Sequence, residues 1–320
     1  MKARGYPHQA VRPIEIPISF WPYFHPALFE EAGSDRLHLG MKVPAEQVFS
    51  LNSFTTQRPG RTTPNTQSSS FVTMADLPID WKHAGQGSSA LEVFLLGTVD
   101  LESALTLQSR IVDQISGRDD QHGVVLVCEH PPSITIGREG SFADVLLEPE
   151  ELVARQTEVR WLNRGGGTIA HAPGQVALYS QIPLHRLNLG LVEYRQRLEQ
   201  TLVATAADLG VEATSAIIPG ATCRCGQFAF IGAAVRDGVT HGGMYVNVTV
   251  PHEGLDVVNW SHSGQRVTSL ATQRTRPTSM ASVRECLIRH LANALGYESY
   301  DLYTGHPLLR RSTRKVYVYA

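Results

Sequence analysis

The sequence has few cysteines, no long hydrophobic run and no excess of basic residues. Four cysteines in 320 residues are too few for a disulfide scaffold, and no Cys-x-x-Cys pair typical of zinc or redox sites occurs. No run of 18 apolar residues is present, so a membrane-spanning helix is not expected. Twenty-eight Lys and Arg against 30 Asp and Glu argue against a nucleic-acid binder. We therefore expect a reducing, cytoplasmic setting.

Lysine and metal-binding motifs are also scarce. The chain has only four lysines, Lys2, Lys42, Lys82 and Lys315. A nucleotide-binding P-loop ends in lysine, so no such loop is expected in the long stretch between Lys82 and Lys315. Thirteen histidines show no His-Glu-x-x-His or similar ligand spacing, and we predict no metal site. Prolines and a glutamate interrupt the apolar positions of the N-terminus, which is not typical of a secretory signal.

The N-terminal 88 residues differ in composition from the rest. The segment 51–70 is rich in Thr, Ser, Gln, Asn and Pro and buries too little surface to offset the entropy of ordering. Residues 1–50 carry scattered aromatics without a period; either they dock on the domain or the true start lies downstream, for example at Met74. We predict a poorly ordered extension over 1–88, a catalytic-type domain over 89–300 and a C-terminal tail over 301–320.

Hydrophobic periodicity predicts an α+β domain from Ala90 onward. We expect helices at 101–116, 148–156, 191–209 and 283–295, and strands at 91–96, 124–128, 159–162, 228–235 and 244–250. The strand at 124–128 is a continuous apolar run typical of burial on both faces. The strand at 244–250 alternates apolar and polar residues, which predicts a half-buried strand. Helices and strands do not alternate strictly, so a mixed sheet packed with helices is favoured over a doubly wound fold.

The most unusual stretch runs from Arg164 through three glycines to His171 and on to Gln175. Glycines after a strand let the backbone approach a ligand closely, and their N–H groups can cradle a carbonyl or a phosphate. In this interpretation Arg164 is a fixed donor and His171 carries protons. The alternative is an ordinary turn. The run matches neither the dinucleotide-binding glycine pattern nor a P-loop, so nucleotide binding is disfavoured.

A second candidate segment is Phe228-Ala-Phe-Ile-Gly232 with Thr240-His-Gly-Gly-Met-Tyr-Val-Asn-Val248. One interpretation is a pair of core strands with a glycine-rich turn. The other is the wall of an apolar channel, from which Gly232 and Gly243 keep side chains out.

The four cysteines fall into two groups. Cys128 and Cys286 lie in apolar patterns that indicate inert core residues. Cys223 and Cys225 flank an arginine in a predicted loop, where a guanidinium can lower a thiol pKa. They are either reactive thiols or unremarkable loop residues.

These motifs resemble, in the same order, those of octanoyltransferases of the lipoate-protein ligase B family. The resemblance starts at Glu129-His-Pro-Pro-Ser-Ile-Thr-Ile-Gly-Arg138, continues through the glycine run and Gly232 to the strand at 243–248, and ends at Val267-Thr-Ser-Leu270. It covers roughly residues 90–300. It implies a biotin/lipoate protein ligase-like α+β catalytic domain.

The resemblance also implies an activity and partners. The expected reaction moves an octanoyl group from octanoyl-acyl carrier protein to a lysine of a lipoyl domain, the first step of protein lipoylation, without a cofactor. The acceptor is expected in a 2-oxoacid dehydrogenase complex or as the glycine cleavage H protein. We expect a monomer that binds neither nucleic acid nor membrane.

The family's substrate-binding positions carry over to three segments of this chain. They are Arg164, Gly165, Gly166, Gly167, Thr168, Ile169, Ala170 and His171; Phe230, Ile231 and Gly232; and Gly243, Met244 and Tyr245. The resemblance implies that they line an acyl channel. One departure is that Gly242 replaces the family's histidine, while His241 lies one place earlier.

The catalytic pair departs further from the family. The family's thioester-forming cysteine corresponds to Ser261, and its pKa-lowering lysine corresponds to Gln227. A serine hydroxyl is nearly inert without an adjacent base, and an amide accepts no proton at neutral pH. General-base help is worth roughly 10²–10⁴-fold, so its loss is costly unless another group replaces it.

Several routes follow from this departure. His171, His241 or His262 could deprotonate Ser261 to give an oxyester intermediate, or the lysine amine could attack the bound thioester directly. A third reading is a catalytically impaired acyl- or partner-binding module. Cys223 or Cys225 as nucleophile is a further alternative, and an ATP-dependent ligase is disfavoured by the lack of a core lysine.

Overall fold

The computed structural model describes residues 65–74, 91–259, 266–273 and 278–318. The helices are α1 (Leu101–Ser116), α2 (Pro149–Ala154), α3 (Leu191–Asp208), α4 (His252–Leu255) and α5 (Met280–Leu295). The strands are β1 (Asn65–Met74), β2 (Leu91–Thr98), β3 (Gly123–Glu129), β4 (Ser133–Ile136), β5 (Glu158–Trp161), β6 (Thr168–His171), β7 (Gln175–Gln181), β8 (Ala213–Ser215), β9 (Gly220–Cys223), β10 (Gly226–Arg236), β11 (Val239–Asn247), β12 (Tyr300–Thr304) and β13 (Leu309–Val318).

An eight-stranded mixed sheet forms the centre of the domain. Its order is β12-β2-β3-β7-β11-β10-β9-β8; β2 pairs in parallel with β12 and β3, whereas β7, β11 and β10 pair antiparallel. A second, three-stranded sheet has the order β5-β4-β6, and the glycine run lies in the connection from β5 to β6. Strand β1 pairs antiparallel with β13. The mixed sheet with flanking helices confirms the predicted α+β class.

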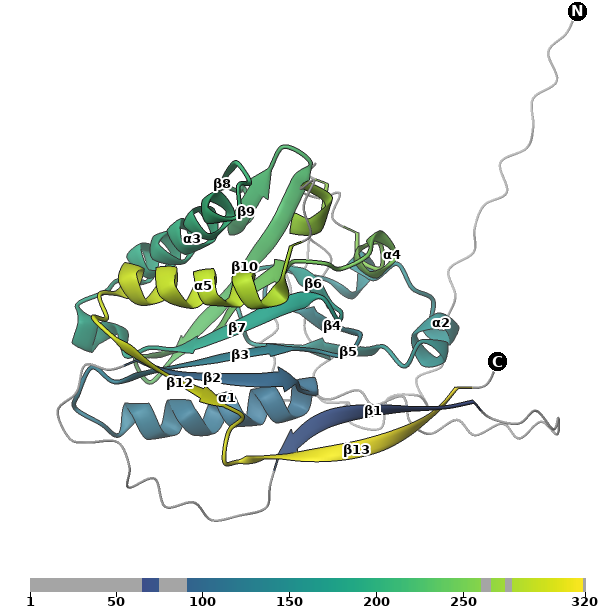
Figure 1. Cartoon of the computed structure of the whole chain (residues 1–320), viewed down its shortest axis with the longest axis horizontal. Helices are drawn as coiled ribbons and strands as arrows, with labels where there is room; N and C mark the ends of the chain where they lie inside the picture. The colour runs from purple at the N-terminus through teal and green to yellow at the C-terminus, as the bar shows by residue number, and fades with distance from the viewer. Residues whose placement is uncertain (1–64, 75–90, 260–265, 274–277, 319–320) are drawn as a thin grey trace, which may run out of the picture. The chain divides into compact units, whose positions relative to one another are not determined.

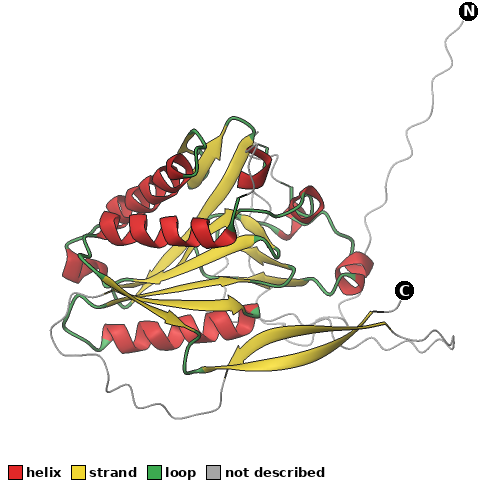
Figure 2. Cartoon of the chain, viewed as in Figure 1, coloured by secondary structure: helices red, strands yellow, loops and turns green. Residues whose placement is uncertain are grey.

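Helices cover both faces of the large sheet. Figure 1 shows α1 on one face and α3 with α5 on the other, and in Figure 2 the strands form the layer between them. The α1 face packs against residues that include Tyr179, Phe230 and Tyr245, while the α3 and α5 face packs against Ile231 and Met244. Two hydrophobic clusters therefore meet the sheet from opposite sides.

Local sequence signals set the helix ends. The Asp100 side chain accepts a hydrogen bond from the Ser103 N–H at 2.8 Å at the start of α1, and Gly117 caps its end. Helix α5 starts at Ser279, whose hydroxyl accepts from two backbone N–H groups, and ends at Gly296 in the left-handed conformation. The predicted helices and the fully buried strand at β3 are confirmed within a few residues at each end.

The prediction of a half-buried strand at 244–250 is wrong in its end point and in its exposure. Strand β11 ends at Asn247, and Met244, Tyr245, Val246 and Asn247 are all buried. The alternation of apolar and polar residues predicted one exposed face, but helices cover both faces of the sheet here. Polar side chains on β11 therefore face a buried hydrogen-bond network instead of solvent.

The chain ends contain strands that the sequence did not predict. Strand β1 falls within the predicted poorly ordered extension, where backbone pairing with β13 orders residues 65–74. Strand β12 lies beyond residue 300 and pairs with β2, so the large sheet extends into the predicted C-terminal tail. Within the described residues, no helix is long and apolar enough to cross a membrane.

Candidate functional site

Arg164 folds the glycine run into a compact loop. Its Nη1 donates to the carbonyls of Gly165 and Gly167, both at 3.0 Å, and its Nη2 donates to the carbonyl of Thr135 at 2.9 Å. Only 2% of Arg164 is exposed, and its guanidinium lies 5.8 Å from the centre of the Tyr245 ring. Its Nε has no partner among the described residues. The buried cation is thus held by carbonyls and an aromatic face, and it fixes the shape of the loop.

A chain of hydrogen bonds runs from Arg164 to the segment after β11. Arg164 Nη2 donates to the Thr135 hydroxyl at 2.8 Å, and that hydroxyl lies 2.8 Å from His171 Nε2. His171 Nδ1 lies 2.8 Å from Gln175 Oε1. An amide oxygen only accepts, so Nδ1 carries the proton and Nε2 accepts from the threonine.

The chain of hydrogen bonds continues through two amides. Gln175 Nε2 donates to the Ala170 carbonyl and to Asn247 Oδ1, each at 2.9 Å. Asn247 Nδ2 donates to the carbonyl of Thr268 at 3.3 Å. All donors point the same way along the chain, which favours cooperative polarisation. The network connects the glycine loop to the tetrapeptide 267–270.

His171 is a neutral imidazole in this environment. Burial, followed by the neighbouring His130 and the Arg164 cation, holds the pKa of His171 well below its usual range. Both ring nitrogens are engaged within the chain, and the ring lies 4.9 Å from that of Tyr245. This geometry allows His171 to hold the Thr135 hydroxyl in place, and through that hydroxyl the Arg164 guanidinium.

The glycines around the loop allow close backbone and side-chain approach. A Cβ on Gly232 would lie 2.9 Å from Arg164 Cδ and 3.2 Å from Tyr245 Cε2. Gly242 has φ +71°, and a Cβ there would lie 2.2 Å from the Gly232 carbonyl oxygen. The family's histidine therefore has no room at position 242. His241 is half-buried, and burial together with Arg236 and Arg138 lowers its pKa.

A second buried histidine belongs to the same region but was not predicted as a site residue. His130 Nδ1 lies 2.7 Å from the Val99 carbonyl, and its Nε2 lies 2.7 Å from the Tyr179 hydroxyl. Its ring lies 5.7 Å from that of His171. Burial lowers the pKa of His130 to about 4. The only feature of the sequence that pointed to His130 as a site residue was its place in the Glu-His-Pro-Pro motif.

Gln227 is the second residue of β10, and its backbone carbonyl accepts from the Thr268 N–H at the end of the hydrogen-bonded network. The residue is 1% exposed. Its side-chain Nε2 donates to the carbonyls of Ala229 at 3.0 Å and Ile218 at 3.3 Å. Its backbone pairs with Arg266 and Thr268. Both amide hydrogens are therefore engaged with backbone oxygens, and the side chain braces the turn before β9.

Ser261 and His262 lie outside the described residues. The residues on either side are anchored: the Asn259 N–H donates to the Asp144 carbonyl at 2.6 Å, and the Arg266 carbonyl accepts from the Gln227 N–H at 2.7 Å. The predicted role of Ser261 remains a prediction.

The predicted substrate-binding residues divide between two faces of the large sheet. Phe230, Gly232 and Tyr245 share the face that meets Arg164, whereas Ile231 and Met244 pack on the α3 and α5 face. In the predicted glycine-run set, Thr168, Ile169, Ala170 and His171 form β6 and are all buried. Thr168 donates to the Asp144 carboxylate at 2.7 Å. Their predicted contact with substrate remains a prediction.

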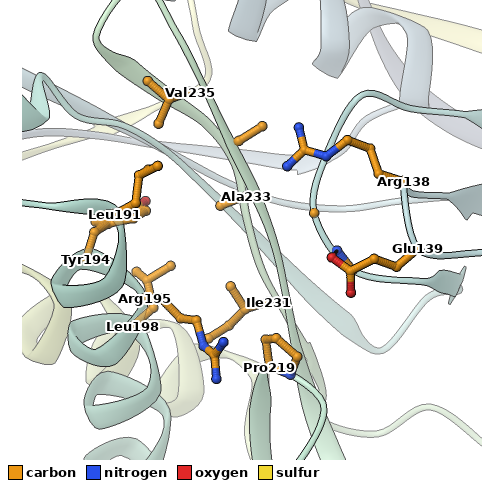
Figure 3. A pocket seen from close by; sticks show the side chains of 13 residues that line it. Arg138, Glu139, Leu191, Tyr194, Arg195, Leu198, Pro219, Ile231, Ala233 and Val235 are labelled. Atoms are coloured by element: carbon orange, nitrogen blue, oxygen red, sulfur yellow. Dashed lines mark hydrogen bonds between the residues drawn. The ribbon is translucent and has the colours of Figure 1, made fainter. Parts of the chain in front are cut away.

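A pocket of about 250 Å³ opens beside the glycine loop. Figure 3 shows side chains of α3 on one side, those of β10 in the middle, and Arg138 with Glu139 on the opposite side. The walls are formed by Arg138, Glu139, Gly165, Gly166, Leu191, Tyr194, Arg195, Leu198, Pro219, Ile231, Ala233, Ala234 and Val235. Gly165, Gly166 and Ile231 belong to the predicted set, whereas Leu191, Tyr194 and Leu198 were predicted only as apolar positions of the helix at 191–209.

The cysteines and acidic groups do not gather at this pocket. Cys128 is buried and its thiol pKa is raised by burial, in agreement with its predicted core position. Cys225 is exposed, and the Cys223 thiol lies 3.3 Å from the Gly226 carbonyl. Among the described residues, no group of three or more His, Cys, Asp or Glu side chains is placed to hold a metal ion.

The sequence matches known proteins over the region that holds the site. Residues 100–292 match the family described as lipoyl protein ligase A/B catalytic domain. An octanoyltransferase of Acidobacterium capsulatum is 33% identical over 196 residues, which are 56% of this chain and 79% of that protein. An octanoyltransferase of Syntrophotalea carbinolica is also 33% identical, over 64% of this chain and 94% of the relative. The mitochondrial octanoyltransferase LIP2 of Arabidopsis thaliana is 28% identical over 65% of this chain and 90% of its own length.

Solved structures share the fold at lower identity. A lipoate-protein ligase A bound with ATP superposes with a TM-score of 0.54 at 15% identity, covering 68% of this chain and 90% of the other. A bipartite lipoate protein ligase from Thermoplasma acidophilum gives a TM-score of 0.53 at 14% identity, covering 68% of this chain and 88% of that one. These likenesses confirm the lipoate ligase-like fold.

Proposed function

Because this chain belongs to the lipoyl protein ligase A/B catalytic domain family, we propose that it transfers an octanoyl group from octanoyl-acyl carrier protein to a lysine of a lipoyl domain. The observation that carries the proposal is the 33% identity to two octanoyltransferases over the stretch that contains the glycine loop. The acceptor class is a lipoyl domain of a 2-oxoacid dehydrogenase complex or the glycine cleavage H protein.

The reaction needs no redox step and no adenylate. The lysine nitrogen attacks the carbonyl carbon of the thioester, a C–N bond forms, the C–S bond breaks, and the proton of the amine passes to the departing thiolate. Orienting the two reactants is worth effective molarities of 10⁵ M or more, on the order of 7 kcal/mol of the barrier. A thioester already has a good leaving group, so positioning alone gives substantial acceleration.

The chain's own residues support a positioning role for the glycine loop. Arg164 holds the carbonyls of Gly165 and Gly167, and Gly165 in turn donates to the carbonyl of Ala233 on β10 at 3.0 Å. In the proposed function, this arrangement fixes one wall of the acyl site. His171 Nε2 then orients the Thr135 hydroxyl, to which Arg164 donates, while Nδ1 is held by Gln175.

Besides the loop thiols Cys223 and Cys225, two routes are open to the acyl group. In the first, Ser261 is acylated and a histidine takes its proton. In the second, the amine attacks the thioester directly. His171 is disfavoured as the base of the first route, because both of its ring nitrogens are already bonded to Thr135 and Gln175. An imidazole in that state has no free nitrogen to accept a proton from serine. This leaves His241 and His262 as the candidate bases.

The test incubates the full chain with octanoyl-acyl carrier protein and an apo lipoyl domain and measures the acceptor mass. Gain of one octanoyl group supports the proposal, and no gain at any enzyme concentration contradicts it. Ser261→Ala separates the routes: loss of the gain indicates the oxyester, and retention indicates direct transfer. Mass spectrometry of the protein itself, quenched before acceptor is added, detects an octanoyl group on Ser261 in the first case only.

One observation favours a second candidate, an acyl-binding module without transfer. Gln227 stands where the family has its lysine, and its amide hydrogens are engaged with the carbonyls of Ile218 and Ala229. An amide so engaged cannot shuttle protons. Binding of the acyl carrier without octanoyl gain on any lipoyl domain would establish this candidate in place of the transferase.

A further inference from the structure

Two arginines flank Gln227, the position at which the family has its lysine. Arg224 lies in the turn between β9 and β10, and Arg266 lies in the segment that runs beside the start of β10. The Gln227 N–H donates to the Arg266 carbonyl at 2.7 Å, and Gln227 forms a parallel bridge with Val267. Backbone hydrogen bonds therefore fix the segment of Arg266 against the strand that follows Arg224.

A glycine allows the two segments to approach closely. Gly226 has φ +141°, and a Cβ there would lie 2.3 Å from the Arg266 carbonyl oxygen and 3.2 Å from Arg266 Cβ. The turn itself is closed by pairing of Cys223 with Gly226, and the Cys223 thiol lies 3.3 Å from the Gly226 carbonyl. The side chains of Arg224 and Arg266 thus start from neighbouring segments of fixed backbone.

These two guanidinium groups have no acidic counterpart in the part of the chain that the structure describes. Both side chains are exposed, and neither forms an ion pair there, whereas Arg289 on α5 pairs with Asp208 at 2.7 Å. Glu212 precedes the β8 residue that pairs with Cys223, but its carboxylate forms no ion pair with Arg224. Two like charges on neighbouring segments repel each other and attract an anion.

The direction of β10 orders the parts of a bound thioester. In the proposed function the thioester lies near Gln227, and its acyl chain extends along β10 toward Gly232. The remainder of the donor then leaves in the opposite direction, toward the turn at Arg224. That turn lies about 10 Å from Gln227 along an extended strand. A phosphopantetheine arm spans about 15 Å from sulfur to phosphorus, roughly as far as four extended residues, so its phosphate reaches the turn.

We infer that Arg224 and Arg266 bind the phosphate of a pantetheine-linked thioester donor. The inference rests on the proposed function for the identity of the donor. Guanidinium groups donate paired hydrogen bonds to phosphate oxygens, and the opposite charges strengthen these bonds. The two arginines hold the outer end of the arm while its sulfur lies near Gln227. The recognised group is the phosphate, which acyl carrier protein and coenzyme A thioesters share.

The test compares two probes that differ only in the phosphate. Isothermal titration of the full chain, without acceptor, gives the affinities for octanoyl-phosphopantetheine and octanoyl-pantetheine. We expect the phosphorylated probe to bind about tenfold more tightly at low ionic strength. The double variant Arg224→Gln with Arg266→Gln should reduce this ratio to about twofold or less. Added salt should also lower the ratio of the parent chain, because both arginines are exposed.

Arg110→Gln is the matched control. Arg110 is exposed on α1 and belongs to neither segment, so its removal should leave the ratio at the value of the parent chain. Thermal unfolding of each variant verifies the fold. The KM for transfer from octanoyl-acyl carrier protein and from octanoyl-coenzyme A distinguishes the two sources of the phosphate. We expect the double variant to raise the KM for the carrier protein.

The outcomes separate the inference from the proposed function. Equal affinity of the parent chain for the two probes contradicts the inference, and so does a ratio that survives in the double variant. A double variant that raises only the KM for the lipoyl domain assigns the arginines to the acceptor and also overturns it. An arginine-dependent ratio in a chain that transfers no octanoyl group keeps the phosphate site and rejects the transfer proposal. Transfer without a preference for the phosphorylated probe does the reverse.

Discussion

The side-chain amide of Gln175 donates a hydrogen bond to the side-chain oxygen of Asn247 at 2.9 Å, across 72 residues of sequence. Both residues are buried, at 2% and 1% exposure. The bond joins the first residue of β7 to the last residue of β11. Through His171 on one side and Thr268 on the other, it links Arg164 to the backbone next to Gln227. The site is therefore held together by one continuous polar network within the core.

Asn247→Ala breaks this network at its centre. We expect the free energy of unfolding to fall by about 1–3 kcal/mol, because a Gln175 amide hydrogen and the Thr268 carbonyl each lose a partner away from water. Urea unfolding followed by circular dichroism measures the loss. Gln121→Ala removes an amide from an exposed hydrogen bond and should stay within about 0.5 kcal/mol. Equal losses in the two variants would contradict the assigned role of the network.

His130 should make the fold less stable in mild acid. Its folded pKa is about 4 against 6.5 for the free side chain, so between these values the unfolded chain binds a proton that the folded chain excludes. The contribution of the neutral His130 to the free energy of unfolding is fully present above pH 6.5. It is lost as the pH falls toward 4, by on the order of 3 kcal/mol. The slope of unfolding free energy against pH measures it.

His130→Gln removes one titrating group and should reduce that slope between pH 4 and 6.5 by the share of one proton, while His171, His241 and His306, whose pKa values are also lowered by burial, keep the rest of it. Tyr179→Phe keeps the imidazole and removes only the hydroxyl 2.7 Å from Nε2, so the slope should persist. A slope in His130→Gln equal to that of the parent chain would exclude His130 as a contributor.

Hydrophobic periodicity predicted four of the five described α-helices, because helices such as α1 bury one face at regular spacing, but only five of the 13 described strands. The glycine run could also be recognised, since three adjacent glycines are rare. The partners of that run could not be predicted. Thr135 and Asn247 sit in strands whose apolar and polar residues alternate, and only the pairing of distant strands brings them to His171 and Gln175. Physical proximity across the sheet leaves no local trace in sequence.

The sequence did not predict the pocket beside the glycine loop, for a related reason. The apolar positions of α3 predicted a helix face packed on the core, and Leu198 does belong to that core. Leu191 is the first residue of the same helix and is 62% exposed. Periodicity gives the face of a helix, whereas the segments that complete a pocket beside it, here β10 and the glycine loop, depend on the whole fold.

Gly243→Ala should be poorly tolerated. A Cβ there would lie 1.9 Å from the carbonyl oxygen of Leu178 on β7, and this backbone atom cannot retreat without breaking the β7–β11 pairing. We expect a loss of at least about 2 kcal/mol in unfolding free energy. Gly117→Ala is the matched control, because its Cβ would meet only ordinary contacts at 3.7 and 3.8 Å. Similar stability of the two variants would show that β7 and β11 can separate at this point.

The double variant Gln227→Lys with Ser261→Cys tests whether the altered catalytic pair limits the rate. A thiol needs far less help than a hydroxyl to become a nucleophile, and a neighbouring lysine ammonium lowers its pKa. The carbonyls of Ile218 and Ala229, which now accept from the Gln227 amide, can accept from an ammonium at the same place. We expect octanoyl transfer to rise about 10²–10⁴-fold over the parent chain, measured by the rate of acceptor mass gain. Each single variant supplies only one member of the pair, so we expect its gain in transfer rate to be far smaller than that of the double variant. A double variant no faster than the parent would mean that Ser261 and Gln227 do not occupy the positions that the family's cysteine and lysine hold.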